Sequence, residues 1–289
     1  MGGRYDATNV IQPAISIITN ISLEHRDYLG NTLVEIAREK AGIIKQATPV
    51  VSGVRQKQAR SVVQQVARKK EAPLFMLGKA FKVRQHQSGQ FSYTGCKNSW
   101  RKLQTPLLGR YQVQNAALAL AACELLINDQ VAISFESIKQ GLANTCWPGR
   151  LEIVCEHPTV ILDGAHNLMA ARNLAKYLAE NLAGRRLTLV IGILGDKPYR
   201  SMLNSLLPDC SRAIITRAQS QRALKPEKLY AIAKKSLADV SIIPDVAAAV
   251  RNAIETAGSD DVICVAGSLY VVGEAKEAIE KGLLKSLKV

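Results

Sequence analysis

The sequence predicts an α/β protein with parallel sheets and two domains. Strand-like apolar runs alternate with helix-like segments along most of the chain, which is the pattern of parallel strands connected by helices. A length of 289 residues, with 47% apolar and 21% charged residues, is sufficient for two globular domains. One stretch near the middle departs from the alternation, and it indicates a small antiparallel sheet inserted in the first half.

The first half opens with a strand, a loop and a helix. Residues 14–20 form an apolar run typical of a buried strand. Thr32 is expected to begin a helix, because Glu35 lies three residues later as in a capping box, and Gly42 is expected to end it. Further elements are expected as a strand at 49–53, a helix near 56–71 and a strand at 74–77.

The pattern changes after this unit. Short alternating runs over residues 80–103, separated by glycines, predict two or three antiparallel strands. An Ala-rich helix is expected at 111–127. Ser134 then caps a further helix that ends near Asn144.

A domain boundary is expected near Pro148 and Gly149, because both residues break regular structure. It divides the chain into a first domain at 1–147 and a second at 148–289. Strands of the second domain are expected at 159–162, 186–193, 212–216, 240–243 and 261–265. Each is followed by a helix-like segment, so the second domain is predicted to be a doubly wound, Rossmann-like parallel sheet.

Composition limits the classes of function. The net charge of +14 attracts anions, which is compatible with nucleotides, polycarboxylates or nucleic acid. The basic residues are dispersed and aromatic residues make up 5%, so no nucleic-acid partner is expected. No apolar run reaches the ~18 residues that cross a bilayer, and the first residues lack a signal-peptide pattern, so we expect no membrane partner and a cytoplasmic location. The six cysteines form no Cys-x-x-Cys pair, which argues against zinc and disulfides and for mostly buried thiols.

Two polar segments follow buried strands in the second half. Residues 163–167 read Asp-Gly-Ala-His-Asn and come directly after the strand at 159–162, at the end of the strand where open α/β sheets bind ligands. Gly267 and Ser268 lie between a strand and a helix, where unpaired backbone N–H groups can hold a carboxylate or phosphate. Plain turn and capping roles are the alternatives for these segments.

Two residues of the first half, His25 and Lys40, are candidate site residues, and each also has an ordinary structural interpretation. His25 lies in the loop after the first strand, where an ordinary loop residue is the simpler interpretation. Lys40 lies near the end of a helix, where the helix dipole favours a solvated cation. The positions three and four residues from Lys40 hold only Ile and Ala, so its side chain is expected beside an apolar stripe.

A series of short motifs runs along the chain. It begins with Gly-Gly-Arg-Tyr-Asp-Ala-Thr-Asn at 2–9 and ends with Ala-Gly-Ser-Leu-Tyr at 266–270. The segments between them lie at 23–30, 36–43, 111–117, 148–150, 163–167 and 195–197. Their order resembles the folylpolyglutamate synthase and dihydrofolate synthase family, a branch of the Mur ligase superfamily. The resemblance implies a Mur-ligase central domain, here incomplete, followed by a Rossmann-like glutamate-ligase domain.

The resemblance also implies a reaction. Such enzymes use ATP to phosphorylate a carboxylate of folate or dihydropteroate, and the amino group of L-glutamate then attacks the acyl phosphate to form an amide. ATP and Mg²⁺ are therefore the implied cofactors, and the implied full-length enzyme is a monomer. The work of such a site is positioning and electrostatic stabilisation of the charge that develops.

The motif positions imply roles for residues in the first domain. By resemblance, His25 is a magnesium ligand, Asn115 contacts adenine, and Lys40 carries a carbamate. Carbamylation turns a cation that repels magnesium into an oxygen-bearing anion.

The second domain supplies the remaining implied contacts. Arg150 and Asp163 are expected to contact the nucleotide in a cleft between the two domains. His166 is expected near the terminal phosphate, and Ser268 near the incoming glutamate. His166 and Lys40 are the residues expected to take part in catalysis.

One part of the family pattern is absent from the sequence. No Gly-x-x-x-x-Gly-Lys-Ser/Thr phosphate loop occurs in the 289 residues. We therefore expect an N-terminally truncated ligase, inactive alone, whose central sheet exposes an apolar edge.

Other readings remain open at this point. The main alternative is a non-catalytic fragment that binds folate, a nucleotide or a partner chain. A cell-wall amino-acid ligase of the same superfamily is a closer rival within the enzyme class. A dehydrogenase is disfavoured because no Gly-x-Gly-x-x-Gly turn follows a strand.

Overall fold

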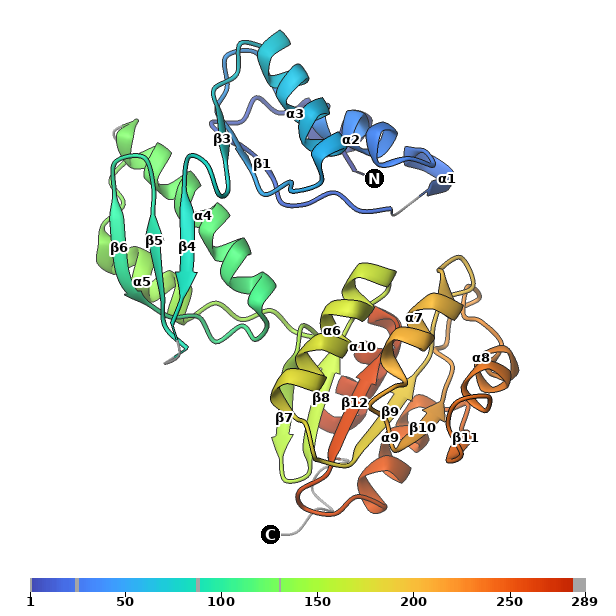
Figure 1. Ribbon diagram of the computed structural model, residues 1–289. Coiled ribbons are helices and arrows are strands. Elements are labelled where there is room, and N and C mark those ends of the chain that lie inside the picture. Colours follow the sequence, from blue (N-terminus) through green and yellow to red (C-terminus); the bar gives the residue numbers. More distant parts are fainter. Residues whose placement is uncertain (1, 24–25, 87–88, 130, 283–289) are drawn as a thin grey trace. The chain divides into compact units, whose positions relative to one another are not determined.

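The protein is described by a computed structural model covering residues 2–23, 26–86, 89–129 and 131–282 (Figure 1). The chain divides into two compact units. The first unit comprises Met1–Pro106 and Arg110–Cys146, and the second comprises Leu107–Gly109 and Trp147–Val289. The first unit contains two three-stranded sheets with separate buried clusters, and the second contains one six-stranded sheet, so each unit is described by itself.

A three-stranded parallel sheet forms one part of the first unit. Its strands lie in the order β1-β2-β3, and helices α2 and α3 pack against each other beside it. The elements are η1 (Ala7–Val10), β1 (Ser16–Ile18), α1 (Arg26–Leu29), α2 (Leu33–Ala41), β2 (Val50–Ser52), α3 (Lys57–Lys69) and β3 (Leu74–Met76). The strand, helix, strand alternation expected from the sequence is confirmed, although each strand is shorter than its apolar run.

Helix α2 begins as its sequence predicts. Thr32 accepts a hydrogen bond from the backbone N–H of Glu35 at 3.2 Å, and the Glu35 carboxylate accepts one from the N–H of Thr32 at 2.9 Å. This reciprocal capping box pairs backbone donors that the first turn leaves free. Helix α2 then buries Ile36, Ala37 and Ala41 in the core, which fixes the face that it presents.

Strand β1 lies at the end of the strand order β1-β2-β3. Ile17, in the middle of β1, is 38% exposed, and Val10 and Ile11 just before the strand are also exposed. The described part of this sheet therefore has an apolar edge, as the sequence predicts, with backbone groups available on its outer side.

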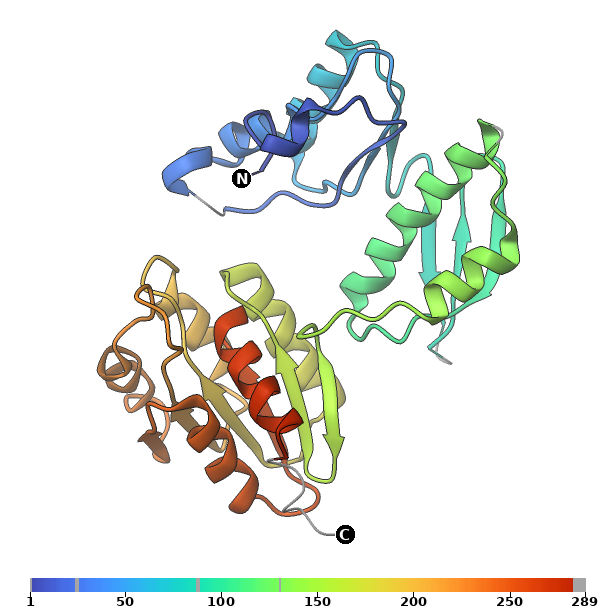
Figure 2. The same ribbon diagram turned by 180° about the vertical axis from the view of Figure 1, so that it is seen from behind.

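An antiparallel sheet forms the other part of the first unit, and it confirms the break in the alternation. It contains β4 (Lys82–Gln85), β5 (Phe91–Thr94) and β6 (Ser99–Leu103), in that order. Helices α4 (Arg110–Asn128) and α5 (Phe135–Ala143) cover one face of it (Figure 2). Tyr93 and Trp100 stack at 5.2 Å between ring centroids on the covered face.

A buried carboxylate from α4 holds the turn between β5 and β6. Glu124 is only 2% exposed and accepts hydrogen bonds from the Tyr93 hydroxyl at 2.6 Å and from the backbone N–H groups of Lys97 at 2.6 Å and Asn98 at 2.7 Å. Burial alone would raise the pKa of Glu124, but these hydrogen bonds outweigh burial and lower it. The sequence pattern did not reveal this network, because its members lie 26 to 31 residues apart.

The second unit is a six-stranded sheet in the order β11-β10-β9-β12-β8-β7. The five parallel strands that the sequence predicts are confirmed. They are β8 (Thr159–Asp163), β9 (Leu187–Ile191), β10 (Arg212–Ile215), β11 (Val240–Ile242) and β12 (Val262–Ala266). The expectation of a purely parallel sheet is wrong, because β7 (Glu152–Glu156) pairs antiparallel with β8 at the edge. Its half-exposed pattern, with glutamates at both ends, gave no buried-strand signal.

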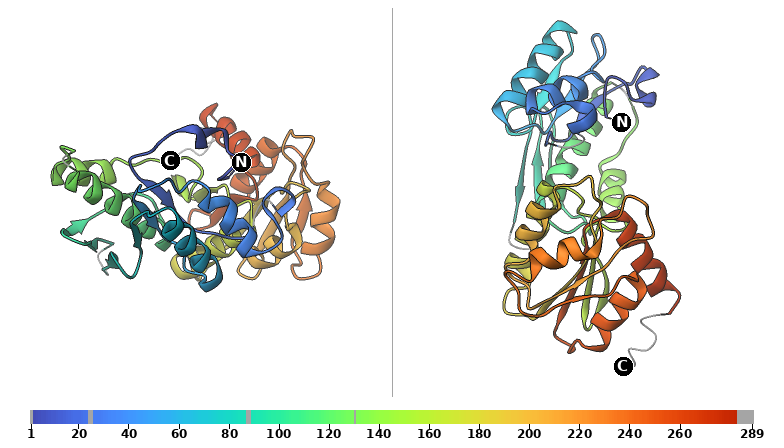
Figure 3. Two further views of the ribbon diagram at one scale, coloured as in Figure 1. Left: turned by 90° about the horizontal axis from the view of Figure 1, so that it is seen from above. Right: turned by 90° about the vertical axis from the view of Figure 1, so that its right-hand side faces the viewer.

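Helices cover both faces of this sheet, as a doubly wound fold requires (Figure 3). Consecutive helices α6, α7 and α8 pack against one another, whereas α9 and α10 form a separate pair with its own core. Their bounds are α6 (Leu168–Asn181), α7 (Tyr199–Leu206), α8 (Pro226–Ala233), α9 (Val246–Glu255) and α10 (Leu269–Glu280). The chain runs from β8 through β9 and β10 to β11 and then turns back, and β12 is inserted between β8 and β9.

The six cysteines are all free, and the expectation that most are buried is wrong. Cys210 and Cys264 are buried, whereas Cys96 and Cys146 are exposed and the other two are intermediate. Within the ranges that the structure covers, no helix is long and apolar enough to cross a membrane.

Replacing Glu124 with glutamine is expected to destabilise the first unit by ~1 to 3 kcal/mol, because an NH₂ donor would then face backbone N–H groups that need an acceptor. Urea unfolding followed by Trp fluorescence would measure the loss. The matched control is Glu136→Gln on α5, where the carboxylate is exposed and, among the described residues, forms an ion pair with Lys139 alone. Equal effects of the two substitutions would contradict the assignment.

The same carboxylate predicts a pH dependence. Because the pKa of Glu124 is lowered in the folded state, its stabilisation is present above the unfolded pKa of about 4.3 and is lost as the pH falls through the folded value. The wild-type free energy of unfolding should therefore fall more steeply than that of Glu124→Gln below about pH 4.3. Parallel pH profiles of the two proteins would argue against this origin.

Candidate functional site

Asp163 lies at the carboxyl end of β8 and organises the loops around it. Its side chain is 5% exposed, and its two oxygens accept hydrogen bonds from the backbone N–H groups of Leu151 and Ala165, both at 2.9 Å. One carboxylate therefore joins the segment before β7 to the segment after β8. The latter is the polar cluster that the sequence predicts.

The charge of Asp163 is sensitive to its surroundings. Burial raises the pKa of this carboxyl group, while the two backbone hydrogen bonds and the charges of Arg150 and His166 act in the opposite direction without cancelling burial. A further cation near the group would favour the charged form. The site thus combines a fixed acceptor with a preference for positively charged neighbours.

Gly164 allows Arg150 to lie across the loop. A Cβ atom at position 164 would be 2.6 Å from an Arg150 guanidinium nitrogen and 2.3 Å from a methyl of Leu269. The N–H of Gly164 also donates to the carbonyl of Gly149 at 2.7 Å. Only glycine fits this approach without displacing its neighbours, which gives Gly164 a steric reason within the motif.

A second anchor holds the segment that carries Arg150. The N–H of Gly149 donates to the Glu152 carboxylate at 2.7 Å, and that carboxylate also pairs with Lys276 of α10 at 2.6 Å. Gly149 has a φ of +68°, a conformation that other residues seldom adopt. The backbone before β7 is therefore fixed to both β7 and α10.

His166 follows two residues after Gly164 and is half-buried. Its Nδ1 lies 2.8 Å from the Gly164 carbonyl oxygen, which can only accept, so Nδ1 carries the proton. Its Nε2 has no hydrogen bond to any described residue, and is left to bind a ligand. Asn167 then caps α6 by accepting a hydrogen bond from the N–H of Ala170 at 2.7 Å.

Gly267 and Ser268 lie at the carboxyl end of β12, beside this loop in the sheet. Ala266 and Asp163 are register partners, so both strand ends lie at one edge. Ser268 is 1% exposed, and its hydroxyl caps α10 by accepting from the N–H of Val271 at 3.1 Å. The capping role that the pattern allowed is thus present, while the glutamate contact implied by resemblance stays a prediction.

The loop after β9 adds charged side chains at the next strand end. Asp196 pairs with Lys197 at 3.1 Å and with Arg222 at 2.8 Å. The sequence contained the Gly-Asp-Lys motif here, but it gave no sign of Arg222, which lies 26 residues away from Asp196. No local spacing signal links these two residues, because the fold alone brings them together.

In the first unit, the segment at 2–9 is seated on the end of α2. The N–H of Arg4 donates to the Glu39 carbonyl at 2.8 Å, and a Cβ atom at Gly3 would be 2.0 Å from the same oxygen. A Cβ at Gly2 would be 3.9 Å from Nζ of Lys40. Two motifs that are separated in sequence therefore meet at Lys40, which is half-buried and forms no ion pair with any described residue.

Asn115 and His25 are the other two candidates of the first unit. Asn115 is exposed on α4, and its amide donates to the Gln112 side chain at 3.1 Å. No hydrogen bond among the described residues joins it to Lys40. His25 lies outside the described residues. The structure thus brings Arg150, Asp163 and His166 together, with Ser268 beside them in the sheet of the second unit.

The described residues match the two implied cofactors, Mg²⁺ and ATP, to different extents. In the covered ranges, no group of three or more His, Cys, Asp or Glu side chains could hold a metal ion. A complete magnesium site is therefore not formed by these residues alone. The guanidinium of Arg150 fits an anionic group such as a phosphate. With Nδ1 protonated, Nε2 of His166 is an acceptor, and it can donate to a phosphate only when the ring takes up a second proton.

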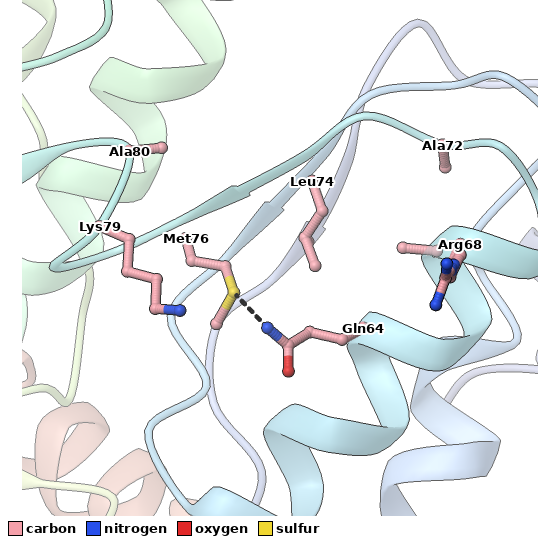
Figure 4. A pocket seen from close by; sticks show the side chains of 8 residues that line it. Gln64, Arg68, Ala72, Leu74, Met76, Lys79 and Ala80 are labelled. Carbon is pink, nitrogen blue, oxygen red and sulfur yellow. Dashed lines mark hydrogen bonds between the residues drawn. The ribbon is translucent and has the colours of Figure 1, made fainter.

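A shallow cavity of about 410 Å³ lies elsewhere in the first unit, between α3 and β3 (Figure 4). Lys79 and Arg68 stand at its two ends, and Gln64 donates to the sulfur of Met76 at 3.7 Å between them. None of the candidate residues lines this cavity.

Comparison with known proteins identifies the fold of both units. The Mur ligase middle domain matches residues 2–123, and the Mur ligase glutamate ligase domain matches residues 149–269. A probable dihydrofolate synthetase of Schizosaccharomyces pombe is 32% identical over 302 aligned positions, covering 95% of this chain and 68% of the relative. The chain belongs to the folylpolyglutamate synthase and dihydrofolate synthase family of Mur ligases.

Other relatives agree with this family. The dihydrofolate synthase/folylpolyglutamate synthase of Bacillus subtilis is 36% identical, covering 97% of this chain and 66% of the relative. The structure of Escherichia coli FolC in complex with DHPP and ADP has a TM-score of 0.89 at 30% identity, covering 97% of this chain and 65% of that one. A Yersinia pestis family member was solved with AMPPNP and a manganese ion, with a TM-score of 0.85 at 31% identity, covering 97% of this chain and 65% of that one. The chain therefore spans about two thirds of the length of these proteins.

Gly164→Ala is expected to move the Arg150 guanidinium and the Leu269 side chain and to lower the free energy of unfolding of the second unit by no more than ~1 kcal/mol, because both contacts are made by the free ends of flexible side chains. Gly273→Ala on α10 is the matched control. No atom lies within 4 Å of its added Cβ, so it should be neutral or slightly stabilising. Urea unfolding followed by circular dichroism compares the two, and an unperturbed Gly164→Ala would refute the steric argument.

Proposed function

We propose that this chain carries out its part of an ATP-dependent ligation that adds L-glutamate to folate or dihydropteroate. The observation that carries the proposal is the arrangement of Arg150, Asp163 and His166 around Gly164, which presents the Arg150 guanidinium and the His166 ring at one edge of the sheet. Support also comes from family members solved with ADP or with a nucleotide analogue.

The reaction has two steps. A carboxylate oxygen of the acceptor attacks the γ-phosphorus of ATP, the bond to ADP breaks, and an acyl phosphate forms. The glutamate amino nitrogen then attacks the acyl carbon, inorganic phosphate leaves, and the nitrogen loses a proton as the amide forms. Both steps move negative charge onto phosphate oxygens, so cationic side chains fixed beforehand can stabilise them.

The second unit would hold the nucleotide. Arg150 is proposed to pair with a phosphate, and its position is maintained by the Gly164 contact and the Gly149 anchor. Asp163 positions the two loops rather than the phosphate, because both of its oxygens already accept backbone hydrogen bonds. His166 is proposed to face the terminal phosphate through Nε2, which donates a hydrogen bond there when the ring carries a proton on both nitrogens.

Further roles rest on the family. Lys40 is proposed to carry a carbamate, formed when its neutral amine adds carbon dioxide and releases a proton. Two observations support it: no described residue forms an ion pair with Lys40, and Gly2 lies close to it. Asn115 is proposed to contact adenine, Ser268 the glutamate and His25 the magnesium ion. Bound Mg²⁺ would neutralise phosphate charge, and no step here is assigned to it.

Replacing Arg150 with glutamine is expected to weaken ADP binding roughly tenfold or more, which corresponds to losing one charged hydrogen bond to phosphate. Isothermal titration calorimetry of the 289-residue chain measures the change. Arg172→Gln on α6 is the control, because it removes the same charge from an exposed helix position. Unchanged ADP affinity in Arg150→Gln would show that the nucleotide does not bind at this site.

A non-catalytic ligand-binding fragment is the second candidate function. It is favoured by the absence of a glycine-rich phosphate loop from the 289 residues. The two functions differ in one measurement, which is the ATP- and glutamate-dependent turnover of a reduced folate by the purified chain. We expect ADP binding without turnover, because the γ-phosphate lacks its cradle. Measurable turnover would show that the chain is a complete catalyst.

A further inference from the structure

The antiparallel sheet of the first unit carries an unusual distribution of charge. From Ala72 to Cys123 the sequence contains seven lysines and arginines and no aspartate or glutamate. The first acidic residue after this stretch is Glu124, whose carboxylate is buried and engaged by the β5–β6 turn. No acidic side chain from within the stretch therefore offsets its positive charge.

Several of these cations lie on one face. Lys82 pairs with Thr94 and Arg84 with Ser92, and directly opposed residues share a face of the sheet. The residues between them, Val83 and Tyr93, point to the opposite face and pack into the core. Lys82 and Arg84 are therefore directed away from α4 and α5.

A bulge in β6 adds two more cations to the same face. Trp100 and Leu103 are both inward, and the register shift places the two residues between them opposite Ser92. These residues are Arg101 and Lys102, and Lys102 has the positive φ of +58° that such an irregularity produces. All four cations are exposed, and none forms an ion pair with a residue that the structure describes.

The rest of this outer face is polar. Ser92, Thr94 and Ser99 contribute hydroxyl groups between the cations, and His86 lies 2.8 Å from the Ser92 hydroxyl. Helices α4 and α5 lie on the opposite face, while α2 and α3 lie beside the parallel sheet, so no helix of the first unit covers this face (Figures 1 and 2). The aromatic rings of Tyr93 and Trp100 are on the covered face, so nucleic-acid bases have nothing to stack on.

We propose that the outer face of β4, β5 and β6 binds an oligo-γ-glutamyl chain. Such a chain carries one carboxylate on each residue, which matches a row of lysines and arginines separated by hydroxyl donors. The choice of a γ-linked occupant rests on the proposed function, because glutamate ligation is the reaction that makes such a chain. The surface would hold the tail of a folate that already carries several glutamates.

The test is calorimetric binding of penta-γ-glutamate, without a pterin group, to the 289-residue chain. Binding should weaken as salt is added, and the peptide with amidated α-carboxylates should not bind. The triple variant Lys82→Gln, Arg84→Gln, Arg101→Gln is expected to lower the affinity roughly tenfold, because it removes three exposed ion pairs. The matched control is Arg200→Gln, Lys228→Gln, Lys235→Gln, which removes three exposed positive charges from α7, α8 and the turn after α8.

The outcomes are distinct. An equal loss in both triple variants would overturn the proposal in favour of a diffuse charge effect, and absence of binding to wild type would overturn it outright. Equal affinity for α-linked pentaglutamate would overturn the γ-linked occupant in favour of an acidic protein segment, and tighter binding of single-stranded DNA would favour nucleic acid. The single variants, each with a smaller loss and an unchanged unfolding midpoint, would exclude misfolding as the cause.

This measurement is independent of the proposed function. Peptide binding needs neither ATP nor turnover, and the sheet residues are remote in sequence from Arg150. Absence of peptide binding by the wild-type chain, with ADP affinity present, would count against the sheet surface alone. Loss of ADP affinity in Arg150→Gln with peptide binding retained would support the nucleotide site and leave the sheet surface intact.

Discussion

The candidate site depends on one buried carboxylate. Asp163 joins two backbone segments because each of its oxygens accepts a hydrogen bond from a different loop. A buried acceptor with two fixed donors leaves little freedom to either segment, since breaking either bond would strand a buried polar group. The positions of Arg150 and His166 follow from this connection, and both residues are presented by short loops on a rigid sheet rather than by long flexible ones.

Much of the architecture could be read from the chain. Apolar runs identified the parallel strands of both units, and Thr32 with Glu35 identified the start of α2. The edge strand β7 was not predicted from the sequence. Its glutamates at both ends and its half-exposed side chains break the continuous apolar run that marks a buried strand. Local patterns therefore find elements that are buried on both faces better than elements at an edge.

The site was predictable only where its residues are neighbours in sequence. The segment at 163–167 was predicted as a polar cluster after a strand. The structure explains its glycine, because a side chain at position 164 would clash with the Arg150 guanidinium. Ser268 was correctly allowed a capping role, since a serine before a helix carries that signal. The pairing of Arg222 and the Glu124 network could not be predicted from the sequence, because the partners come from distant segments that only the folded chain brings close.

The salt bridge between Glu152 and Lys276 has a practical consequence for engineering. It ties the entry of the second unit to its own last helix, so the path of the backbone at Gly149 is determined locally. Insertions upstream of Trp147 that leave Leu107–Gly109 in place should therefore not disturb the geometry around Arg150. An exchange of the second unit between relatives would have to carry Leu107–Gly109 together with the segment from Trp147 onward.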